Sequence, residues 1–588
     1  MEIHLKKNDE IELNITDISN TGEGIGHYEG MTFFVSGAIP GDTIRAGITK
    51  LKKTYGYARL IEILEASPDR VEPVCPVALR CGGCQIMQMD YRAQLRWKEQ
   101  SVRSKLHRIG GFSDEVLDRV MQPIIGMEEG GGFREAGAGF VPCFFRNKAQ
   151  YPVGRDAVGD TVMGFYAGHS HRIISTDKCY LGTPINEAIR DVITGCDEVV
   201  PYDETSHTGL LRHVMIRRSE HYPDVMVVLV VNSSQMTRDV REMADVLLPE
   251  LLGIGDVAEA SYQSDEAKRV TSVVVSFNDK PGNVIMGDRC ETVYGEGYIR
   301  DRIGDVEYHI SALSFYQVNP TQTKKLYDKV LEYADLTGSE VVWDLYCGIG
   351  TISLYMARHA AAVYGVEVIP DAIRDAKENA ALNGIENARF FVGKAEVVLP
   401  EFYSRSDVDI SDAKHPDVIV VDPPRKGCNE SCLSTILEMQ PDRIVYVSCD
   451  HATLARDLKY LCTSDKASYT LTAVTPLDQF CHSVHVETVC LLSKLSGAKH
   501  HVNIKLDMDE MDLTAAESKA TYDEIREWVQ EKYGFHVTNL NIAQVKREHG
   551  IIERENYNKP RSEDSRQPGC PKEKVKAIGE ALRFFQMI

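Results

Sequence analysis

Apolar and polar residues alternate with a period of two near the start of the chain, a pattern typical of half-buried strands. Residues 11–15 alternate in this way, and turn sequences follow at 21–24 and 40–42. Short strands at this spacing predict a five-stranded β-barrel of the oligonucleotide-binding type over residues 8–64. A mixed pattern of strands and helices follows as far as residue 320.

From about residue 321, apolar runs of strand length alternate with amphipathic helices. The strand-like runs are residues 341–345, 363–366, 418–421 and 444–447. Helices such as residues 373–383 lie between them, and this order predicts an α/β fold with a doubly wound, Rossmann-like sheet of parallel strands. Ligands of such sheets bind at the carboxyl ends of the strands, so functional residues are expected there.

The chain is therefore expected to have four parts. They are a barrel (1–66), a mixed α/β central domain (67–320), the Rossmann-like domain (321–496) and a small C-terminal extension (497–588). In the extension, a helical pattern starts at Thr514 and ends before Gly534, and further segments follow at 537–545 and 572–586. The glycine-rich stretch 129–143 is predicted to be an inserted loop.

The composition is typical of globular protein. Of the 588 residues, 43% are hydrophobic and 26% are charged. The longest apolar run, residues 225–231, is far shorter than the ~18–20 residues of a membrane span, and the first ten residues lack the apolar core of a signal peptide. We expect a cytoplasmic location without a membrane partner. Nothing in the sequence demands an oligomer, so a monomer is expected.

The net charge of −21 argues weakly against a nucleic-acid partner, but local charge argues for one. Residues 45–59 carry five cations and no acid: Arg45, Lys50, Lys52, Lys53 and Arg59. Tyr55 and Tyr57 stand among them as stacking platforms, which suits single-stranded nucleic acid. An edge strand protected by lysines is the alternative. Further cations around Arg146 and Arg212 extend the RNA-facing surface that we expect.

Three of the fifteen cysteines form a close group. Five residues separate Cys75 from Cys81, and two separate Cys81 from Cys84, with glycines between the closer pair. Thiols spaced in this way can wrap one inorganic cluster, and Cys179 is the candidate for a fourth ligand. An iron–sulfur cluster is favoured. Tetrahedral zinc is the alternative, although a six-residue step is unusual for a zinc knuckle.

A glycine turn follows the first strand of the Rossmann-like domain. Asp344 lies in that strand, Gly348 and Gly350 follow it, and Glu367 ends the next strand. Glycines let a ligand approach the backbone, and a terminal carboxylate can accept both hydroxyls of a ribose. Together these features predict a site for an adenosine-containing cofactor.

Three further residues lie at strand ends. Asp422 precedes two prolines that stop its strand and present it to the crevice, unless the motif is only a strand terminator. Cys449 follows the neighbouring strand at a helix start, which is expected to lower its pKa; a buried hydrophobe is the alternative. Glu487 has apolar neighbours that should raise its pKa and suit it as a general base.

These motifs, in this order, resemble the uracil-C5 RNA methyltransferase family, and most closely its 23S rRNA branch with a TRAM domain and a [4Fe-4S] cluster. The resemblance covers about residues 8–495. It rests on the four cysteines and on residues 314–319, 344–350, 422–427, 448–457 and 485–488. It implies that Cys75, Cys81, Cys84 and Cys179 hold the cluster, and that Gln317, Tyr346, Glu367 and Asp422 bind S-adenosylmethionine.

The resemblance also implies the chemistry. Cys449 would attack C6 of uracil and so make C5 nucleophilic, and Glu487 would remove the C5 proton after methyl transfer. The expected product is 5-methyluridine in 23S rRNA. The alternatives are the T-loop of tRNA and a non-catalytic RNA-binding assembly factor. Two departures affect RNA contacts more than chemistry: residues 450–451 are Asp-His where the family usually has Asn-Pro, and Cys481 replaces a usual proline.

Overall fold

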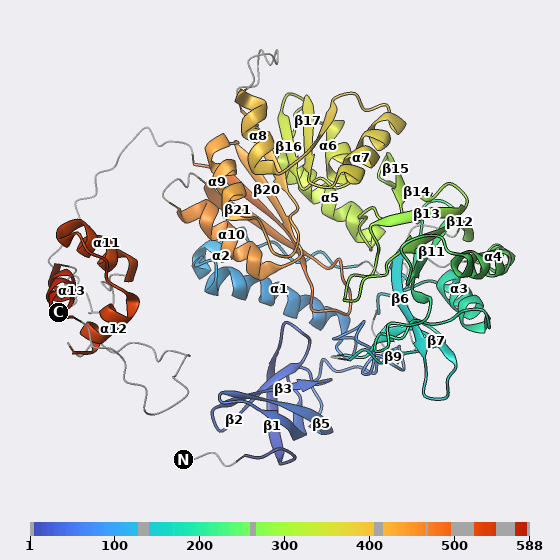
Figure 1. Cartoon of the computed structure of the whole chain (residues 1–588), viewed down its shortest axis with the longest axis horizontal. Coiled ribbons are helices and arrows are strands. Elements are labelled where there is room, and N and C mark those ends of the chain that lie inside the picture. Colours follow the sequence, from blue (N-terminus) through green and yellow to red (C-terminus); the bar gives the residue numbers. More distant parts are fainter. Residues whose placement is uncertain are drawn as a thin grey trace. The chain divides into compact units, whose positions relative to one another are not determined.

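The computed structural model divides the chain into two compact units, residues 1–496 and 497–588, which are described separately (Figure 1). The structure describes residues 5–127, 140–168, 170–258, 266–404, 415–464, 469–495, 522–548 and 571–584. Most of the predicted insertion at 129–143 and the predicted helix start at Thr514 lie outside the described residues.

The first five strands form the predicted barrel. They are β1 (Glu10–Ile18), β2 (Gly24–Tyr28), β3 (Met31–Ser36), β4 (Thr43–Leu51) and β5 (Tyr55–Glu65), closed in the order β1-β2-β3-β5-β4. Ile11, Leu13 and Ile15 alternate into the interior, where they pack with Phe33 and Val35. The period-two pattern therefore identified the barrel correctly, because each strand has one buried face.

The central region is built on a six-stranded mixed sheet. Its order is β13 (Arg289–Tyr294), β12 (Arg269–Phe277), β11 (Asp224–Val231), β10 (Leu211–Arg218), β6 (Lys148–Arg155) and β7 (Thr161–Met163). Helices α3 (Pro184–Gly195) and α4 (Arg238–Gly253) pack on it through one apolar core. Two small antiparallel pairs complete the region: β8 (Phe165–Tyr166) with β9 (Ile173–Ile174), and β14 (Tyr298–Ile303) with β15 (Val306–Ser311).

The Rossmann-like domain has a seven-stranded sheet. Its order is β18 (Ala388–Val392), β17 (Ala362–Glu367), β16 (Val341–Leu345), β19 (Val418–Val421), β20 (Arg443–Ser448), β22 (Glu487–Lys494) and β21 (Tyr469–Leu477). The first five strands are parallel, as predicted, whereas β22 runs antiparallel to β20 and β21. The amino end of β22 therefore lies at the same edge as the carboxyl ends of the parallel strands.

Helices join the strands of this sheet and cover it (Figure 1). They are α5 (Pro320–Ala334), α6 (Thr351–Ala357), α7 (Pro370–Leu382), α8 (Ala395–Ser404), α9 (Glu430–Met439) and α10 (His451–Thr463). Two helices from before the central sheet also pack here: α1 (Tyr91–Arg108) and α2 (Asp114–Val120). Val102 and Leu106 of α1 share a core with Leu454 and Leu458 of α10. None of the described helices is both long and apolar enough to cross a membrane.

The second unit contains three helices among its described residues: α11 (Tyr522–Tyr533), α12 (Asn539–Glu548) and α13 (Lys572–Phe584). Gly534 ends α11 with φ 73°, as the glycine signal predicted, and its N–H donates to the carbonyl of Gln530. Ile525, Val529, Ile578 and other apolar side chains form its own small core.

A buried ion pair fixes α1 to the connection between β21 and β22. Nζ of Lys98 lies 2.5 Å from Oδ1 of Asp478, and both side chains are 0% exposed. The hydroxyl of Tyr91 donates to Oδ2 of Asp478 at 2.9 Å, and Lys98 also donates to the carbonyl of Phe480. The buried charges are thus paired and hydrogen-bonded, as a water-free site requires.

We expect Lys98→Met to lower the free energy of unfolding by about 3–5 kcal/mol, because it leaves the Asp478 carboxylate buried without its partner. The measurement is denaturant unfolding followed by fluorescence. Arg96→Met on the same helix is the matched control, since its pair with Asp69 is exposed on both sides and should cost less than about 1 kcal/mol. Equal losses for the two variants would contradict this account.

Candidate active site

Four strand ends bring the predicted functional residues to one edge of the Rossmann-like sheet. Asp422 follows β19 and Cys449 follows β20, which are paired parallel neighbours. Glu487 begins β22, and the antiparallel register pairs Ser448 with Thr488, so Cys449 and Glu487 lie opposite one another one position beyond this pair. The glycine turn follows β16, the other neighbour of β19. Topology alone therefore gathers residues that are far apart in the sequence.

The turn after β16 has backbone that a ligand can approach closely. Tyr346 adopts φ 71°, and Gly348 and Gly350 adopt φ 54° and 78°. One Glu367 oxygen accepts a hydrogen bond from the N–H of Gly348 at 3.3 Å, while the other accepts from the N–H groups that follow it. Glu367 is thus held at the end of β17, next to the turn, as the adenosine-site prediction requires.

A buried carboxyl group in the strand before this turn holds the turn in place. Asp344 is 1% exposed, and the hydroxyl of Ser353 on α6 donates to its Oδ2 at 2.5 Å. Burial raises the pKa of Asp344 to about 7, and the charge of Asp422 adds to the shift. The hydrogen bond joins the strand before the turn to the helix after it and so fixes the shape of the turn.

Cys449, Glu487, Asp422 and Arg425 form one electrostatic group. Burial raises the pKa of Asp422 to about 7 and that of Glu487 well above its usual range, with Asp422 adding to the second shift. Oε1 of Glu487 is buried and has no hydrogen-bond partner among the described residues. A buried carboxyl with a free oxygen and a raised pKa suits proton transfer, which agrees with the prediction for Glu487.

The pKa of Cys449 departs from the prediction. Burial raises it to about 12, and the carboxylates of Glu487 and Asp422 add to that shift. The expected lowering by the helix start is wrong, because burial and the two carboxylates outweigh it. The first amides of α10 are capped by Asp450, which accepts from the N–H groups of Ala452 and Thr453. The guanidinium of Arg425 donates to the Cys449 sulfur and opposes the rise.

Sequence reasoning gave no role to Arg425, although it follows the two prolines after Asp422. A cation directly after an Asp-Pro-Pro strand end was the available signal, because the rigid turn directs it to the same edge. Gln479 was missed too. Its Nε2 donates to Oε1 of the buried Gln317 at 3.3 Å and to Oγ1 of Thr323 at 3.0 Å. These hydrogen bonds fix Gln317 to the connection between β21 and β22, which leads to Glu487.

The four predicted cysteine ligands lie together. Burial raises the pKa of Cys75, Cys81 and Cys84. The charge of Cys179 adds to the rise at all three, and at Cys84 the charges of the other two cysteines add as well. The N–H of Gly83 donates to the Cys81 sulfur at 3.4 Å, so a backbone amide does reach a thiol. The charge of Arg146 opposes the rise in the pKa of Cys84 without cancelling it.

Among the described residues, no group of three or more His, Cys, Asp or Glu side chains is placed to hold a single metal ion. Whether the four thiols hold an iron–sulfur cluster or zinc therefore stays a prediction.

The expected cationic surface is only partly present. Lys52 and Lys53 are exposed, and near them the Tyr57 ring makes a tilted contact with Phe34 and an edge-on contact with Tyr55. Arg212, however, is 4% exposed and donates to the carbonyls of Asn278 and Lys280. Its assignment to an RNA-facing surface is wrong, because β10 is a central strand and both its faces are covered.

The two departures from the family pattern have structural roles. Asp450 is the N-cap of α10, and Nε2 of His451 lies 3.0 Å from Oγ of Ser101 on α1. Cys481 is 1% exposed and packs in the apolar cluster that includes Cys75 and Cys84. These residues therefore contribute to packing between α1, the segment that contains Cys75 and Cys84, and the edge of the sheet where Cys449 lies.

Comparison with known proteins identifies the class. Residues 5–61 match the TRAM domain, and residues 290–495 match the tRNA (Uracil-5-)-methyltransferase family. The chain is 44% identical over 493 residues to an RNA methyltransferase of Halalkalibacterium halodurans described as uncharacterised, covering 83% of this chain and 98% of the relative. An RNA methyltransferase of Clostridium acetobutylicum, also described as uncharacterised, is 42% identical over 496 residues. The match covers 84% of this chain and 99% of the relative.

A solved structure shares the fold. It is the tRNA (uracil-54, C5)-methyltransferase of Pyrococcus abyssi in complex with S-adenosyl-L-homocysteine, 25% identical with a TM-score of 0.59, covering 82% of this chain and 100% of that one. The chain belongs to the TRAM-domain RNA uracil-C5 methyltransferases, and it is an enzyme of that class.

The raised pKa of Cys449 and the charges beside it predict how fast its thiol is alkylated. Its alkylation by iodoacetamide should rise about tenfold per pH unit from about pH 7 to 10 without a plateau, because the thiolate fraction grows in that way below the pKa. At about pH 9, Glu487→Gln should speed alkylation several-fold by removing a negative charge, and Arg425→Met should slow it. Peptide mass spectrometry gives the rates.

Cys462 is the internal reference for this measurement. Burial alone raises its pKa to about 12, and no charged group contributes to the shift. Neither substitution should change its alkylation rate. If both variants moved the Cys449 rate in the same direction, the opposing roles of Glu487 and Arg425 would be refuted.

Proposed function

We propose that the protein transfers a methyl group from S-adenosylmethionine to C5 of a specific uridine in 23S rRNA, through a covalent adduct between Cys449 and C6. One observation carries the proposal: the Cys449 thiol, the buried carboxyl of Glu487 with its free oxygen and the Arg425 guanidinium meet at the edge of the sheet where the glycine turn also lies.

The cofactor site would be formed by Gln317, Tyr346, Glu367 and Asp422. Glu367 is positioned to accept the ribose hydroxyls, and the left-handed backbone of the glycine turn leaves room beside it. Gln317 is oriented by Gln479. S-adenosylmethionine would supply the electrophilic methyl group, and side chains of the protein would activate the uracil and remove its C5 proton.

Uracil C5 is too weakly nucleophilic to take a methyl group unaided. Attack of the Cys449 thiolate on C6 converts the ring to an enolate whose C5 is nucleophilic. Arg425 stabilises the thiolate through its hydrogen bond. After methyl transfer, Glu487 takes the C5 proton, and elimination releases Cys449. The target base must be unstacked first, which favours single-stranded loops of RNA.

The four cysteines would hold a [4Fe-4S] cluster, with Cys75, Cys81, Cys84 and Cys179 as ligands. Their convergence and the amide of Gly83 on the Cys81 sulfur support this assignment. No redox step is required by the proposed reaction. Equal amounts of iron and acid-labile sulfide in anaerobically purified protein, both lost in Cys84→Ser, are expected; zinc without sulfide would contradict the assignment.

Two RNAs are candidate substrates, 23S rRNA and tRNA. The resemblance of the motifs and cysteine group is to the 23S rRNA branch, whereas the Pyrococcus abyssi structure is of a tRNA enzyme. Mapping 5-methyluridine in rRNA and tRNA from a deletion strain tests this directly. Loss of one or two sites in 23S rRNA is expected, and loss from the tRNA T-loop would redirect the proposal to tRNA.

Catalysis itself is tested by trapping. RNA that contains 5-fluorouridine should form an adduct stable to denaturing gel electrophoresis, because the fluorine at C5 cannot be removed as a proton. Cys449→Ala should abolish the adduct, whereas Glu487→Gln should retain it and should also accumulate an adduct with ordinary RNA. Cys462→Ala is the control and should behave as wild type.

If neither rRNA nor tRNA gave an adduct, the covalent mechanism would be wrong and a non-catalytic RNA-binding role would be favoured.

A further inference from the structure

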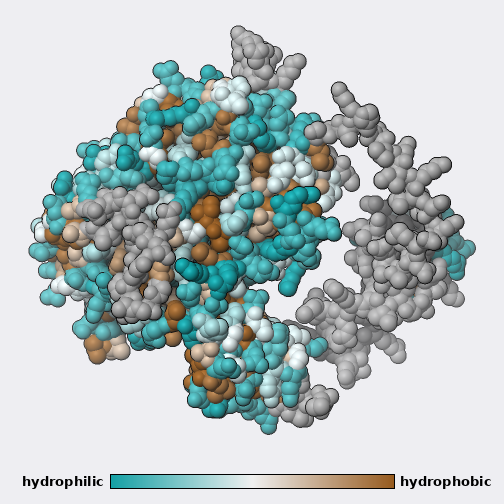
Figure 2. Space-filling view, turned by 180° about the vertical axis from the view of Figure 1, so that it is seen from behind, coloured by the Kyte–Doolittle hydropathy of each residue, from teal (hydrophilic) through white to brown (hydrophobic). Residues whose placement is uncertain are grey.

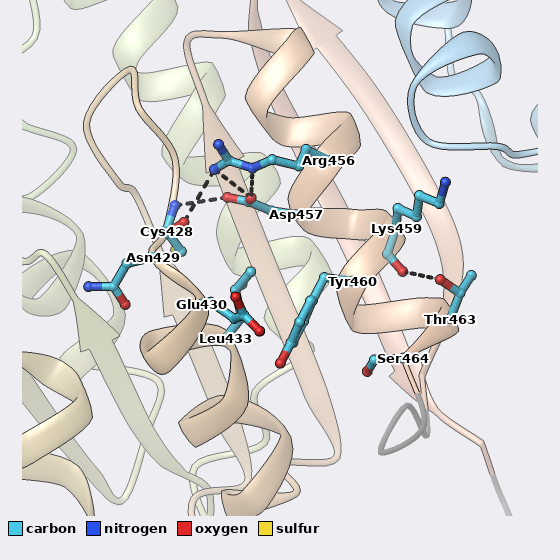
Figure 3. Close-up of a pocket in the computed structure, with 10 residues that line it drawn as sticks. All are labelled: Cys428, Asn429, Glu430, Leu433, Arg456, Asp457, Lys459, Tyr460, Thr463 and Ser464. Atoms are coloured by element: carbon cyan, nitrogen blue, oxygen red, sulfur yellow. Dashed lines mark hydrogen bonds and ion pairs between the residues drawn. The ribbon is translucent and has the colours of Figure 1, made fainter. Parts of the chain in front are cut away.

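Irregular segments beside the proposed active site need partners for their backbone groups, because no helix or strand supplies them. Side chains can fill this role. After Asp422, for example, the guanidinium of Arg456 donates to the carbonyl of Cys428 at 3.2 Å (Figure 3). Residues 312–319 form another irregular segment, between β15 and α5, and contain Gln317. The groups that bind this segment therefore decide where Gln317 lies.

The partners of residues 312–319 come from the central sheet. Nδ2 of Asn147 donates to the carbonyl of Gln317 at 2.9 Å, and the N–H of Asn147 donates to the carbonyl of Val318 at 3.0 Å. The guanidinium of Arg217 donates to the carbonyl of Ser314 at 2.8 Å. Three carbonyls of the segment are thus bound by two residues of the central sheet and its approach.

Asn147 is itself held in place on both sides. Its carbonyl accepts from the N–H of Arg218 at 2.8 Å, and the N–H of Arg146, the residue before it, donates to the carbonyl of Leu181 at 3.0 Å. Asn147 is 3% exposed, so water competes little for its hydrogen bonds. The residue that binds the Gln317 backbone is therefore a fixed support for it.

The side chain of Gln317 is held from the other direction. Its Oε1 accepts from Nε2 of Gln479 at 3.3 Å, whereas its own Nε2 makes no hydrogen bond to any residue that the structure describes. An amide nitrogen only donates, so this group is free to donate to a ligand. S-adenosylmethionine offers acceptors on its carboxylate, ribose and adenine. Gln479 thus sets which way the amide faces, and Asn147 sets where its backbone lies.

We propose that Asn147 is a positioning residue of the cofactor site, which holds the backbone of Gln317 so that the free amide nitrogen of Gln317 can donate to S-adenosylmethionine. The hydrogen bonds from Asn147 to the carbonyls of Gln317 and Val318 carry the inference. It rests on the function proposed above, which makes Gln317 a cofactor-binding residue. It also gives a role to the one uncharged residue between the cations Arg146 and Lys148.

Loss of the Asn147 side chain would act on one carbonyl. In Asn147→Ala both backbone hydrogen bonds of residue 147 remain, and only the donor to the Gln317 carbonyl is removed. A buried carbonyl without a donor is costly, so the backbone would turn to find another partner. Residues 312–319 have no helix or strand to resist that movement, and the Gln317 side chain would move with them.

The first test is calorimetric titration of the full chain with S-adenosylmethionine. We expect Asn147→Ala to bind the cofactor about fivefold more weakly with unchanged stoichiometry, because each folded molecule keeps a site that has lost one hydrogen bond behind it. A merely structural role would instead lower the stoichiometry, through unfolded molecules, and leave the dissociation constant unchanged. That second result would overturn the proposal.

Asn278→Ala is the matched control. Asn278 is 4% exposed, lies directly after β12 of the same central sheet, and donates through Nδ2 to the carbonyls of Val284 and Ile285 at 2.6 and 2.9 Å. It makes no hydrogen bond to residues 312–319. Its affinity for S-adenosylmethionine should equal that of the wild type. An equal weakening in both variants would show that damage to the central sheet, and not the Gln317 contact, is the cause.

A double-mutant cycle tests whether Asn147 acts through Gln317. Gln317→Ala should weaken cofactor binding, and Asn147→Ala in that background should weaken it by less than about twofold more, because the side chain that Asn147 positions is already gone. If the two losses simply multiplied, Asn147 would act by another route and the proposal would be wrong.

A second variant covers the case in which Asn147→Ala does not fold. Asn147→Ser leaves a smaller empty volume, and its hydroxyl ends one bond closer to the backbone than Nδ2 does, so the donor to Gln317 is still lost. The same fivefold weakening is expected, at about the magnitude of one hydrogen bond. Wild-type affinity in Asn147→Ser would overturn the proposal.

Failure of this proposal is distinguishable from failure of the proposed function. If the wild-type protein did not bind S-adenosylmethionine, the proposed function would fail. If it bound the cofactor and Gln317→Ala bound it equally well, the assignment of Gln317 would fail and the role of Asn147 with it. If Gln317→Ala weakened binding and Asn147→Ala did not, the function would stand and only the positioning role would be refuted.

Discussion

The buried pair between Lys98 and Asp478 is the constraint on which the catalytic end of the molecule depends. Neither charge could be left alone in a water-free interior, so α1 and the connection from 478 to 486 can be placed only together. Glu487 follows this connection directly, and Val484 within it packs against Ile18 of the barrel. One ion pair thereby relates the barrel, α1 and the proposed general base. The hydrophilic and hydrophobic residues on one face of the molecule are displayed in Figure 2.

The cysteine segment is tied to the same connection. The N–H groups of Gln85 and Ile86 both donate to the carbonyl of His482, whose backbone is left-handed at φ 63°, and the His482 ring bonds to the carbonyl of Pro142. A cluster held by the neighbouring cysteines would therefore influence catalysis by fixing backbone geometry. A structural role of this kind would need no redox step.

The catalytic edge concentrates acid groups around a single thiol. Asp344, Asp422 and Glu487 all have raised pKa values because burial disfavours their charged forms. The same burial raises the pKa of Cys449, and Arg425 acts in the opposite direction.

The sequence by itself determined the barrel, the parallel sheet and most of the strand-end residues, because period-two alternation, strand–helix order and turn residues are local signals. It also proposed Cys179 beside the other three thiols. Only the tertiary structure decided the rest. Burial reversed the expected pKa of Cys449 and removed Arg212 from the surface, while contacts between distant segments revealed Lys98 with Asp478. Desolvation and long-range pairing depend on what surrounds a residue in space, and no local pattern encodes that.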